Sequence, residues 1–91
     1  MNNTILVSYD LIAPGKDYSR LWEHLRSYSS WTKPLESVWL LKTQRSATEV
    51  RDNLKSHIDK NDKLLVIDVT SKAAAWHNLG DKINQWIKNN L

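Results

Sequence analysis

One carboxylate in the sequence, Asp10, follows a nearly continuous apolar run and is the first candidate for chemistry. Residues 4–11 read as a buried strand, and the alternation of side chains places Leu6, Ser8 and Asp10 on one face of it. A carboxylate at the rim of an open sheet face is a suitable ligand for Mg²⁺, which binds one or two carboxylates together with water. An Asp that ends a strand also commonly accepts N–H bonds from the following loop. The sequence is compatible with both interpretations of Asp10.

Three basic residues are expected near Asp10. Lys16 and Arg20 come in the loop and the first helical turns after it, and Lys63 begins a later strand. Such side chains could bind phosphate groups, although scattered Lys and Arg also form the ordinary solvated surface of a protein. The net charge of +3 and the pI of about 9.3 permit nucleic-acid binding without requiring it.

Other catalytic and binding motifs are missing from the sequence. The chain has no cysteine, which excludes disulfides, thiolate nucleophiles and cysteine zinc sites. Neither a phosphate-binding glycine loop nor a GxSxG nucleophile motif is present. His24, His57 and His77 lie in separate expected helices without HxH or HExxH spacing, so we expect surface histidines and not a zinc site.

The elements that would position these residues begin with the strand at 4–11 and a helix that follows it. Apolar side chains recur at helical spacing between residues 18 and 28, and Asp17 is a suitable N-cap. Residues 31–35 read as a short strand, in which Pro34 favours an edge position. Residues 37–43 read as a further strand.

The second half of the chain repeats this alternation. Ser46 and Glu49 have the spacing of a capping box, in which each side chain binds the other residue's N–H, and an apolar stripe continues to residue 58. Residues 63–70 form the clearest strand. Residues 72–90 read as a C-terminal amphipathic helix, because they carry apolar residues at helical spacing: Trp76, Leu79, Ile83, Trp86 and Ile87.

This order predicts an α+β fold, the ferredoxin-like split β-α-β-β-α-β sandwich with an added C-terminal helix, as a single domain over residues 1–91. The strand order would be 4-1-3-2, which brings Asp10 close to Ser37 and to Lys63. Asp68, late in the last strand, would lie more than ~10 Å from Asp10. The two carboxylates are therefore not expected to share a metal within one subunit.

The length of 91 residues allows one small core, whose limited stability an oligomer would increase. No apolar run approaches the ~20 residues that span a bilayer, and the N-terminus lacks a charged and apolar leader. The expected location is the cytoplasm.

Three short segments resemble the CRISPR-associated Cas-two family and the related small SinR-like proteins and VapD-type ribonucleases. These segments are Ser8-Tyr9-Asp10-Leu11, Ser37-Val38-Trp39 and the apolar strand at 63–70. The resemblance implies a ferredoxin-like homodimer formed through the open sheet faces. It further implies a Mg²⁺-dependent endonuclease for RNA or DNA, with Asp10 of each copy as catalytic residue and metal ligand and with Tyr9 and Ser37 as supporting neighbours.

Two alternatives remain open. In place of the family's C-terminal strand this sequence has the Trp-rich stretch 72–90, which could cover the sheet or contact a partner. The chain would then be a catalytically inactive dimeric adaptor, and an exposed apolar patch at Trp31, Trp76 and Trp86 would favour that function. A single-stranded nucleic-acid binder would instead need aromatic residues such as Trp39 on the open sheet face.

Overall fold

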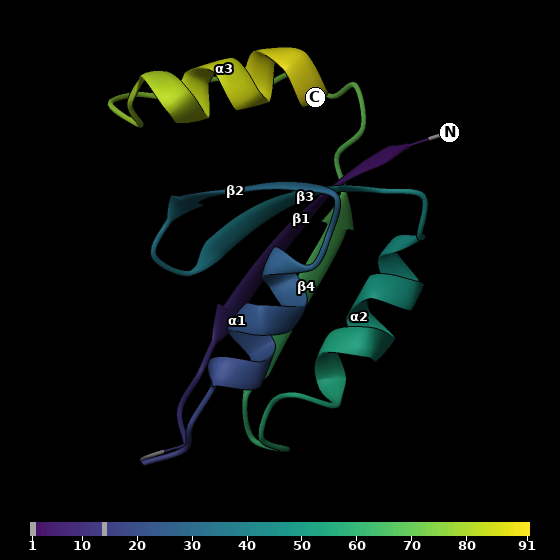
Figure 1. Ribbon diagram of the computed structural model, residues 1–91, viewed down its shortest axis with the longest axis vertical. Coiled ribbons are helices and arrows are strands. Elements are labelled where there is room, and N and C mark those ends of the chain that lie inside the picture. The colour runs from purple at the N-terminus through teal and green to yellow at the C-terminus, as the bar shows by residue number, and fades with distance from the viewer. Residues whose placement is uncertain (1, 14) are drawn as a thin grey trace.

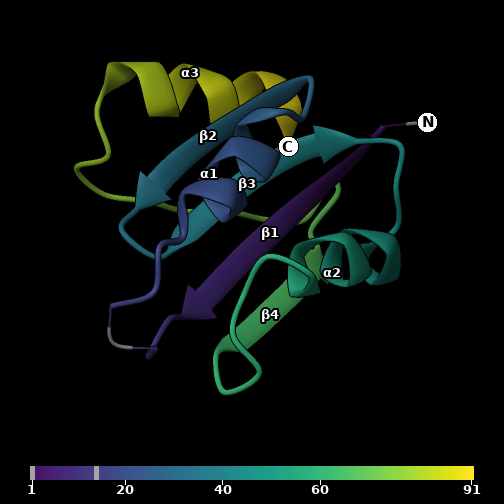
Figure 2. The same ribbon diagram turned by 60° about the horizontal axis from the view of Figure 1, so that its bottom comes forward.

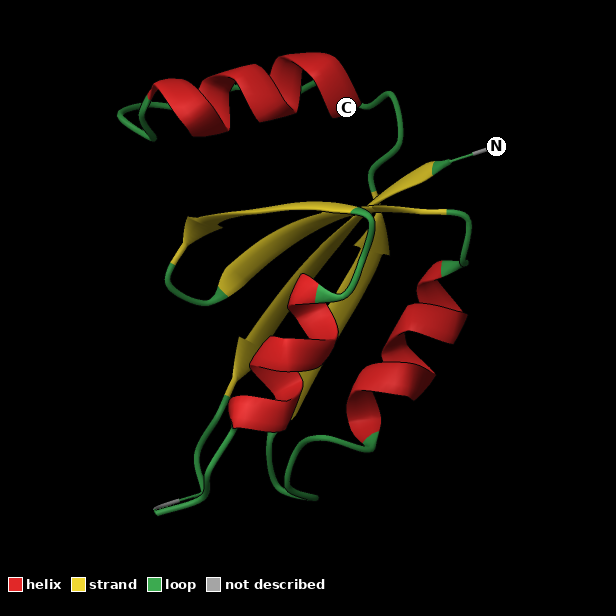
Figure 3. Ribbon diagram, in the orientation of Figure 1, coloured by secondary structure: helices red, strands yellow, loops and turns green. Residues whose placement is uncertain are grey.

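The computed structural model describes residues 2–13 and 15–91. Four strands and three helices alternate along these residues (Figures 1 and 3). In chain order they are β1 (Asn3–Asp10), α1 (Ser19–Arg26), β2 (Ser30–Leu35), β3 (Val38–Thr43), α2 (Ala47–Lys55), β4 (Lys63–Asp68) and α3 (Asp81–Asn90). This succession agrees with the expected one, except that the last helix is shorter. None of the helices in the described residues is long and apolar enough to cross a membrane.

The strands form one open antiparallel sheet in the order β2-β3-β1-β4. Counted from the other edge, this is the order expected from the sequence. β2 is an edge strand, as Pro34 indicated, because a residue without an N–H is tolerated best where no ladder bond is needed. A register irregularity lies between Thr32 and Leu35 of the same strand. The molecule is thus a small α+β fold built on a four-stranded sheet.

α1 and α2 cover one face of the sheet, and the core lies between them and the strands (Figure 1). Alternation along β1 directs Ile5 and Val7 into this core, as expected. Each helix contributes two fully buried side chains: Leu21 and Leu25 from α1, and Val50 and Leu54 from α2. Complete burial of such a side chain stabilises the fold by roughly 1.5–3 kcal/mol.

The start of α2 is fixed by the capping box that the sequence predicted. The Glu49 N–H donates to Ser46 Oγ at 3.1 Å, and the Ser46 N–H donates to Glu49 Oε1 at 3.1 Å. At α1 the structural N-cap is Tyr18, one residue after the expected Asp17. The Asp17 carboxylate nevertheless accepts the N–H of Ser19 at 2.9 Å, so it still satisfies a free donor of the first turn.

α3 lies on the other face of the sheet, over β2 and away from β4 (Figure 2). Ile87 is its one buried residue. The indole N–H of Trp86 donates to Ser30 Oγ at 2.9 Å, and the Lys42 ammonium donates to the Asn90 carbonyl oxygen at 2.6 Å. α3 therefore covers the β2 side of this face and leaves the β1–β4 side open.

The prediction of a helix over residues 72–90 was wrong for its first part, since α3 begins at Asp81. Residues 71–80 have an irregular path in which Ser71 and Asn78 have positive φ angles. Gly80 is the N-cap, with a φ of 94° that other residues rarely adopt. Trp76 lies outside the helix, where its indole N–H donates to Asn84 Oδ1 at 2.7 Å. The apolar spacing before residue 81 therefore reflects packing against the sheet and α3.

Candidate functional site

Asp10 is the last residue of β1 and is exposed on the face that α1 and α2 do not cover. Its cross-strand partner is Lys63, the first residue of β4. A shallow hollow of about 210 Å³ lies beside the pair, and Ser8 and Leu65 also line it. The expected closeness of Asp10 and Lys63 is confirmed, and it follows directly from the strand order.

Ser37 and Tyr9 are neighbours, also as expected. The Tyr9 N–H donates to the Ser37 carbonyl oxygen at 3.2 Å. The Tyr9 side chain belongs to the helix face, where its hydroxyl accepts the indole N–H of Trp39 at 3.0 Å and donates to the Glu36 carbonyl oxygen at 3.3 Å. Burial raises the pKa of Tyr9, an effect that the Trp39 hydrogen bond partly offsets. The phenol is therefore protonated at neutral pH and points away from the face of Asp10.

The other two predicted basic residues do not share the pairing that joins Asp10 and Lys63. The Lys16 ammonium lies 5.9 Å from the centroid of the Tyr18 ring. Arg20 is exposed on α1, which packs on the opposite face of the sheet, and it interacts with Asp17. Arg20 therefore lies across the sheet from Asp10, and the phosphate-binding role of Lys16 and Arg20 stays a prediction.

The donor groups around Asp10 in one copy do not fit a Mg²⁺ ion. Among residues 2–13 and 15–91, no group of three or more His, Asp and Glu side chains converges to hold a metal. Asp10 is the one carboxylate lining its hollow, and the Lys63 ammonium on the neighbouring strand would repel a cation. A metal site at Asp10 therefore needs ligands from outside this copy.

Asp68 is distant from Asp10, as expected. It pairs with Ile5, whereas Asp10 pairs with Lys63, so five residues of strand, or roughly 17 Å, separate the two carboxylates. Asp68 Oδ1 accepts both the N–H of Thr70 at 2.9 Å and its hydroxyl at 2.5 Å. These bonds lower the pKa of Asp68. Its role is to close the turn after β4.

β4 carries an apolar surface next to Asp10. Leu65 is 56% exposed and Ile67 is 43% exposed, and both lie on the open side of the sheet. In the β1–β4 register Ile67 is opposite Leu6 and Leu65 is opposite Ser8. The sequence predicted an apolar strand over residues 63–70 but not this exposed row. The exposed row could have been predicted from the alternation along β4 and from the lack of an element that covers the second face of this strand.

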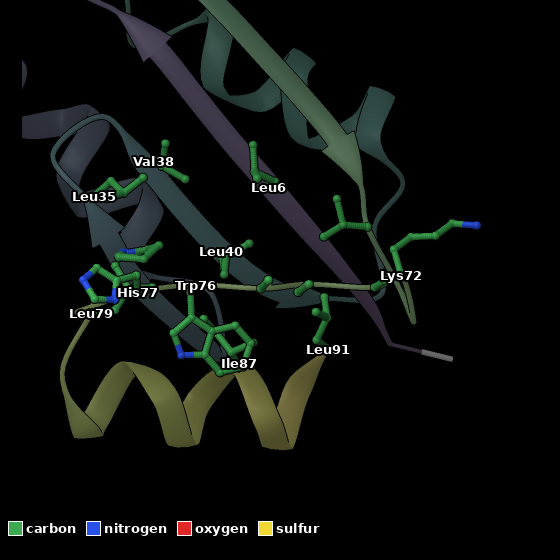
Figure 4. A pocket seen from close by; sticks show the side chains of 15 residues that line it. Leu6, Leu35, Val38, Leu40, Lys72, Trp76, His77, Leu79, Ile87 and Leu91 are labelled. Carbon is green, nitrogen blue, oxygen red and sulfur yellow. The ribbon is translucent and has the colours of Figure 1, made fainter.

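An apolar groove of about 430 Å³ continues this surface beneath α3 (Figure 4). Its floor is the open sheet face, and its roof is α3 with the irregular segment before it. Side chains that line it include Leu6, Val38, Leu40, Trp76, Ile87 and Leu91. Sequence reasoning missed the groove because it exists only when the chain before α3 is extended and not helical.

Trp22, Trp31 and Trp39 lie on the helix side of the sheet. Trp39 is 3% exposed and stacks on Trp22 at a centroid distance of 6.4 Å, with 11° between the ring planes. Trp31 is 37% exposed at the edge, and the Lys33 ammonium lies 5.9 Å from the Trp39 ring. Trp39 therefore fills the core and is not placed to stack on nucleic-acid bases. Trp76 lies on the other side of the sheet, where it lines the apolar groove beneath α3.

Two histidines lie together, contrary to the expectation of separate surface histidines. The rings of His24 on α1 and His57 after α2 have centroids 5.0 Å apart. Burial lowers the pKa of His24, and the charges of His57 and Arg45 lower it further. His77 lies in the segment before α3 on the other side of the sheet. Motif spacing missed the pair because one member lies on α1 and the other in the turn after α2.

No family model matches the chain, and no solved structure matches it.

Proposed function

We propose that this chain is a ferredoxin-like interaction module that forms a homodimer through the β1–β4 side of its open sheet face. One observation carries the proposal: Leu65 and Ile67 are exposed side by side on β4, beyond the part of the face that α3 covers. Apolar side chains grouped on an otherwise polar surface are typical of protein contacts. Neither a membrane nor a bound nucleic acid is needed to account for this surface.

The register of β1 and β4 makes the surface complementary to itself. Consider a two-fold axis that runs between the two strands and parallel to them. Each residue then faces its own cross-strand partner in the second copy, as the C₂ symmetry of an isologous contact requires. One row joins two apolar residues, Leu6 with Ile67, and one joins an acid to a base, Asp10 with Lys63. The row between them places the small polar Ser8 against Leu65.

The energy available from this contact is consistent with a reversible dimer. Leu65 and Ile67 together expose about one complete side chain per copy. Burying both pairs would contribute roughly 3–6 kcal/mol at the usual 1.5–3 kcal/mol per side chain. Association costs at least ~4 kcal/mol of lost motion, so the neighbouring groove and the two charge pairs must supply the remainder.

The test is the solution mass of single variants, measured by light scattering. We expect the native chain to have twice its monomer mass of 10.6 kDa and Leu65→Glu to be monomeric. The matched control is Ile12→Glu, which adds the same charge at a residue that is 50% exposed in the loop after β1. This variant should remain dimeric. A native chain of 10.6 kDa at millimolar concentration would refute the proposal.

The second candidate is the metal-dependent endonuclease implied by the resemblance to the Cas-two family. The position of Asp10 at the rim of the same open face favours it, because two copies meeting there would supply two carboxylates. Mg²⁺ held between them would lower the pKa of a bound water and neutralise charge in phosphodiester cleavage. Lys63 is the basic residue placed to contact the nucleic acid. The cytoplasmic location also remains a prediction.

Two variants, Lys63→Met and Asp10→Asn, separate the two candidates. Lys63→Met removes the ammonium opposite Asp10, which weakens the charge pairing of an interaction module and removes a charge that repels a metal. The adaptor function predicts weaker dimerisation of Lys63→Met and no Mg²⁺-dependent cleavage of RNA or DNA by any variant. The nuclease function predicts cleavage by the native chain that Asp10→Asn abolishes while circular dichroism shows an unchanged fold.

A further inference from the structure

His24 and His57 meet on the helix side of the molecule, on the far side of the sheet from the proposed dimer contact. Their ring centroids are 5.0 Å apart, with 37° between the planes. Two imidazoles that bind one tetrahedral metal at 2.0–2.1 Å have centroids roughly 5.2 Å apart. The observed separation is compatible with two histidine ligands on one metal ion.

A second observation at this place points to a missing bonding partner. His24 Nε2 is a buried side-chain nitrogen that makes no hydrogen bond within the described residues. The nearby Tyr28 hydroxyl is also buried without a bond of normal geometry, although the Asn53 side chain is close enough to lower the pKa of Tyr28. They belong to the same contact, since the two rings meet edge to face at 5.5 Å. Folded proteins rarely leave such atoms unpaired, because each one costs the energy of its lost hydration.

The charges around the pair are compatible with a divalent ion. Arg45, in the segment before α2, is the basic group that acts on both His24 and Tyr28. Its guanidinium lies 4.0 Å from the Glu49 carboxylate, which offsets its positive charge.

We propose that His24 and His57 form a two-imidazole site for a divalent transition metal of the zinc class. Imidazole nitrogen suits Zn²⁺, Cu²⁺ and Ni²⁺, whereas Mg²⁺ prefers oxygen ligands. His24 Nε2 supplies one bond and the His57 ring the second. Water completes the coordination shell, and the Tyr28 hydroxyl is a hydrogen-bond partner within the same contact. The ion links α1 to the segment after α2 and thereby stabilises the packing of the two helices against each other.

The test is a calorimetric titration of the full chain with ZnCl₂ in a buffer that does not bind zinc. We expect one ion per chain, with affinity reduced at least tenfold in His57→Gln. The matched control is His77→Gln, which removes a histidine outside the pair and should bind as the native chain does. His57→Gln is preferred to His24→Gln, because the buried His24 contributes to helix packing, and circular dichroism verifies that each variant is folded.

Proton NMR provides a second measurement that does not depend on affinity alone. The imidazole signals of His24 and His57 should shift together on addition of zinc, while the signal of His77 stays unchanged. The proposal is overturned if 1 mM zinc does not bind the native chain. It is also overturned if His77→Gln loses as much affinity as His57→Gln, because binding would then be unspecific.

Discussion

The C-terminal end of α3 is held to the sheet by Lys42 of β3. Its ammonium donates to the Asn90 carbonyl oxygen at 2.6 Å and to Thr4 Oγ1 at 3.0 Å. The Thr4 hydroxyl in turn donates to the same carbonyl oxygen. Thr4 has no exposed surface, so water cannot replace these bonds without a local opening. Lys42→Met retains most of the aliphatic stem of the side chain and removes the charge and its donors.

The expected loss is about 2 kcal/mol in the free energy of unfolding. A hydrogen bond to a charged group contributes ~1.5–3 kcal/mol net. A cation at a helix C-terminus contributes about 0.3–1 kcal/mol, which overlaps with the first value because the same ammonium supplies both. At 1.4 kcal/mol per factor of ten, the unfolding equilibrium shifts about 30-fold.

Urea unfolding followed by circular dichroism measures this loss. The control is Lys88→Met, which removes the same charge from an exposed position in the last turn of α3. A second measurement is the NMR signal of the Trp86 indole N–H, which should move towards its solvent-exposed position in Lys42→Met, since its bond to Ser30 is lost when α3 detaches. Equal stability of the two variants, with an unchanged Trp86 signal, would refute this account of α3.

Three further predictions concern the fold that carries the site. Burial raises the pKa of Asp62, but the hydrogen bonds from the Tyr18 hydroxyl and the Ile12 N–H outweigh it and leave that pKa below its usual value. This stabilisation is complete above about pH 4 and is lost as the pH falls through the lower folded-state pKa. The free energy of unfolding in urea should therefore fall less steeply with decreasing pH in Asp62→Asn than in the native chain. Equal slopes in the two proteins would contradict this prediction. Leu54→Ala empties a fully buried site and should cost ~2–5 kcal/mol in the same assay, and a loss below 1 kcal/mol would place Leu54 outside the core. Ser46→Ala removes one half of the capping box and should cost about 1 kcal/mol, whereas Ser46→Gly should cost less; equal losses would exclude capping by the hydroxyl.

Much of the fold follows from local patterns in the sequence. Alternation along β1 determines which face meets the helices, because a register change of one residue would expose Ile5 and Val7. Ser46 and Glu49 set the start of α2 through bonds within four residues of chain. Pro34 marks the edge strand for a similarly local reason. The strand order then places Ser37 and Lys63 near the end of β1.

The remainder depends on contacts between distant segments. Trp76 and Leu79 have helical spacing, yet they are apolar because they line a groove formed with the sheet. The local pattern alone does not distinguish a helix from an irregular segment that packs on a sheet. Arg20 follows Asp10 closely in the chain, but the packing of α1 places it on the opposite face of the sheet. His24 and His57 converge only when α1 and α2 pack together, which no spacing motif detects.

The account as a whole requires that the β1–β4 face be buried against a second copy. Sheets that pack face to face lie ~10 Å apart, and adjacent strands ~4.8 Å apart, so the two-fold arrangement places the two Asp10 Cα atoms roughly 11 Å from each other. The chain has no cysteine, so Asp10→Cys provides a single thiol per copy for a bismaleimide of that length. Thr48→Cys, exposed on α2, is the control. The account predicts efficient covalent dimers of Asp10→Cys at low micromolar concentration and none of Thr48→Cys; equal yields from both variants, or none from Asp10→Cys, would contradict it.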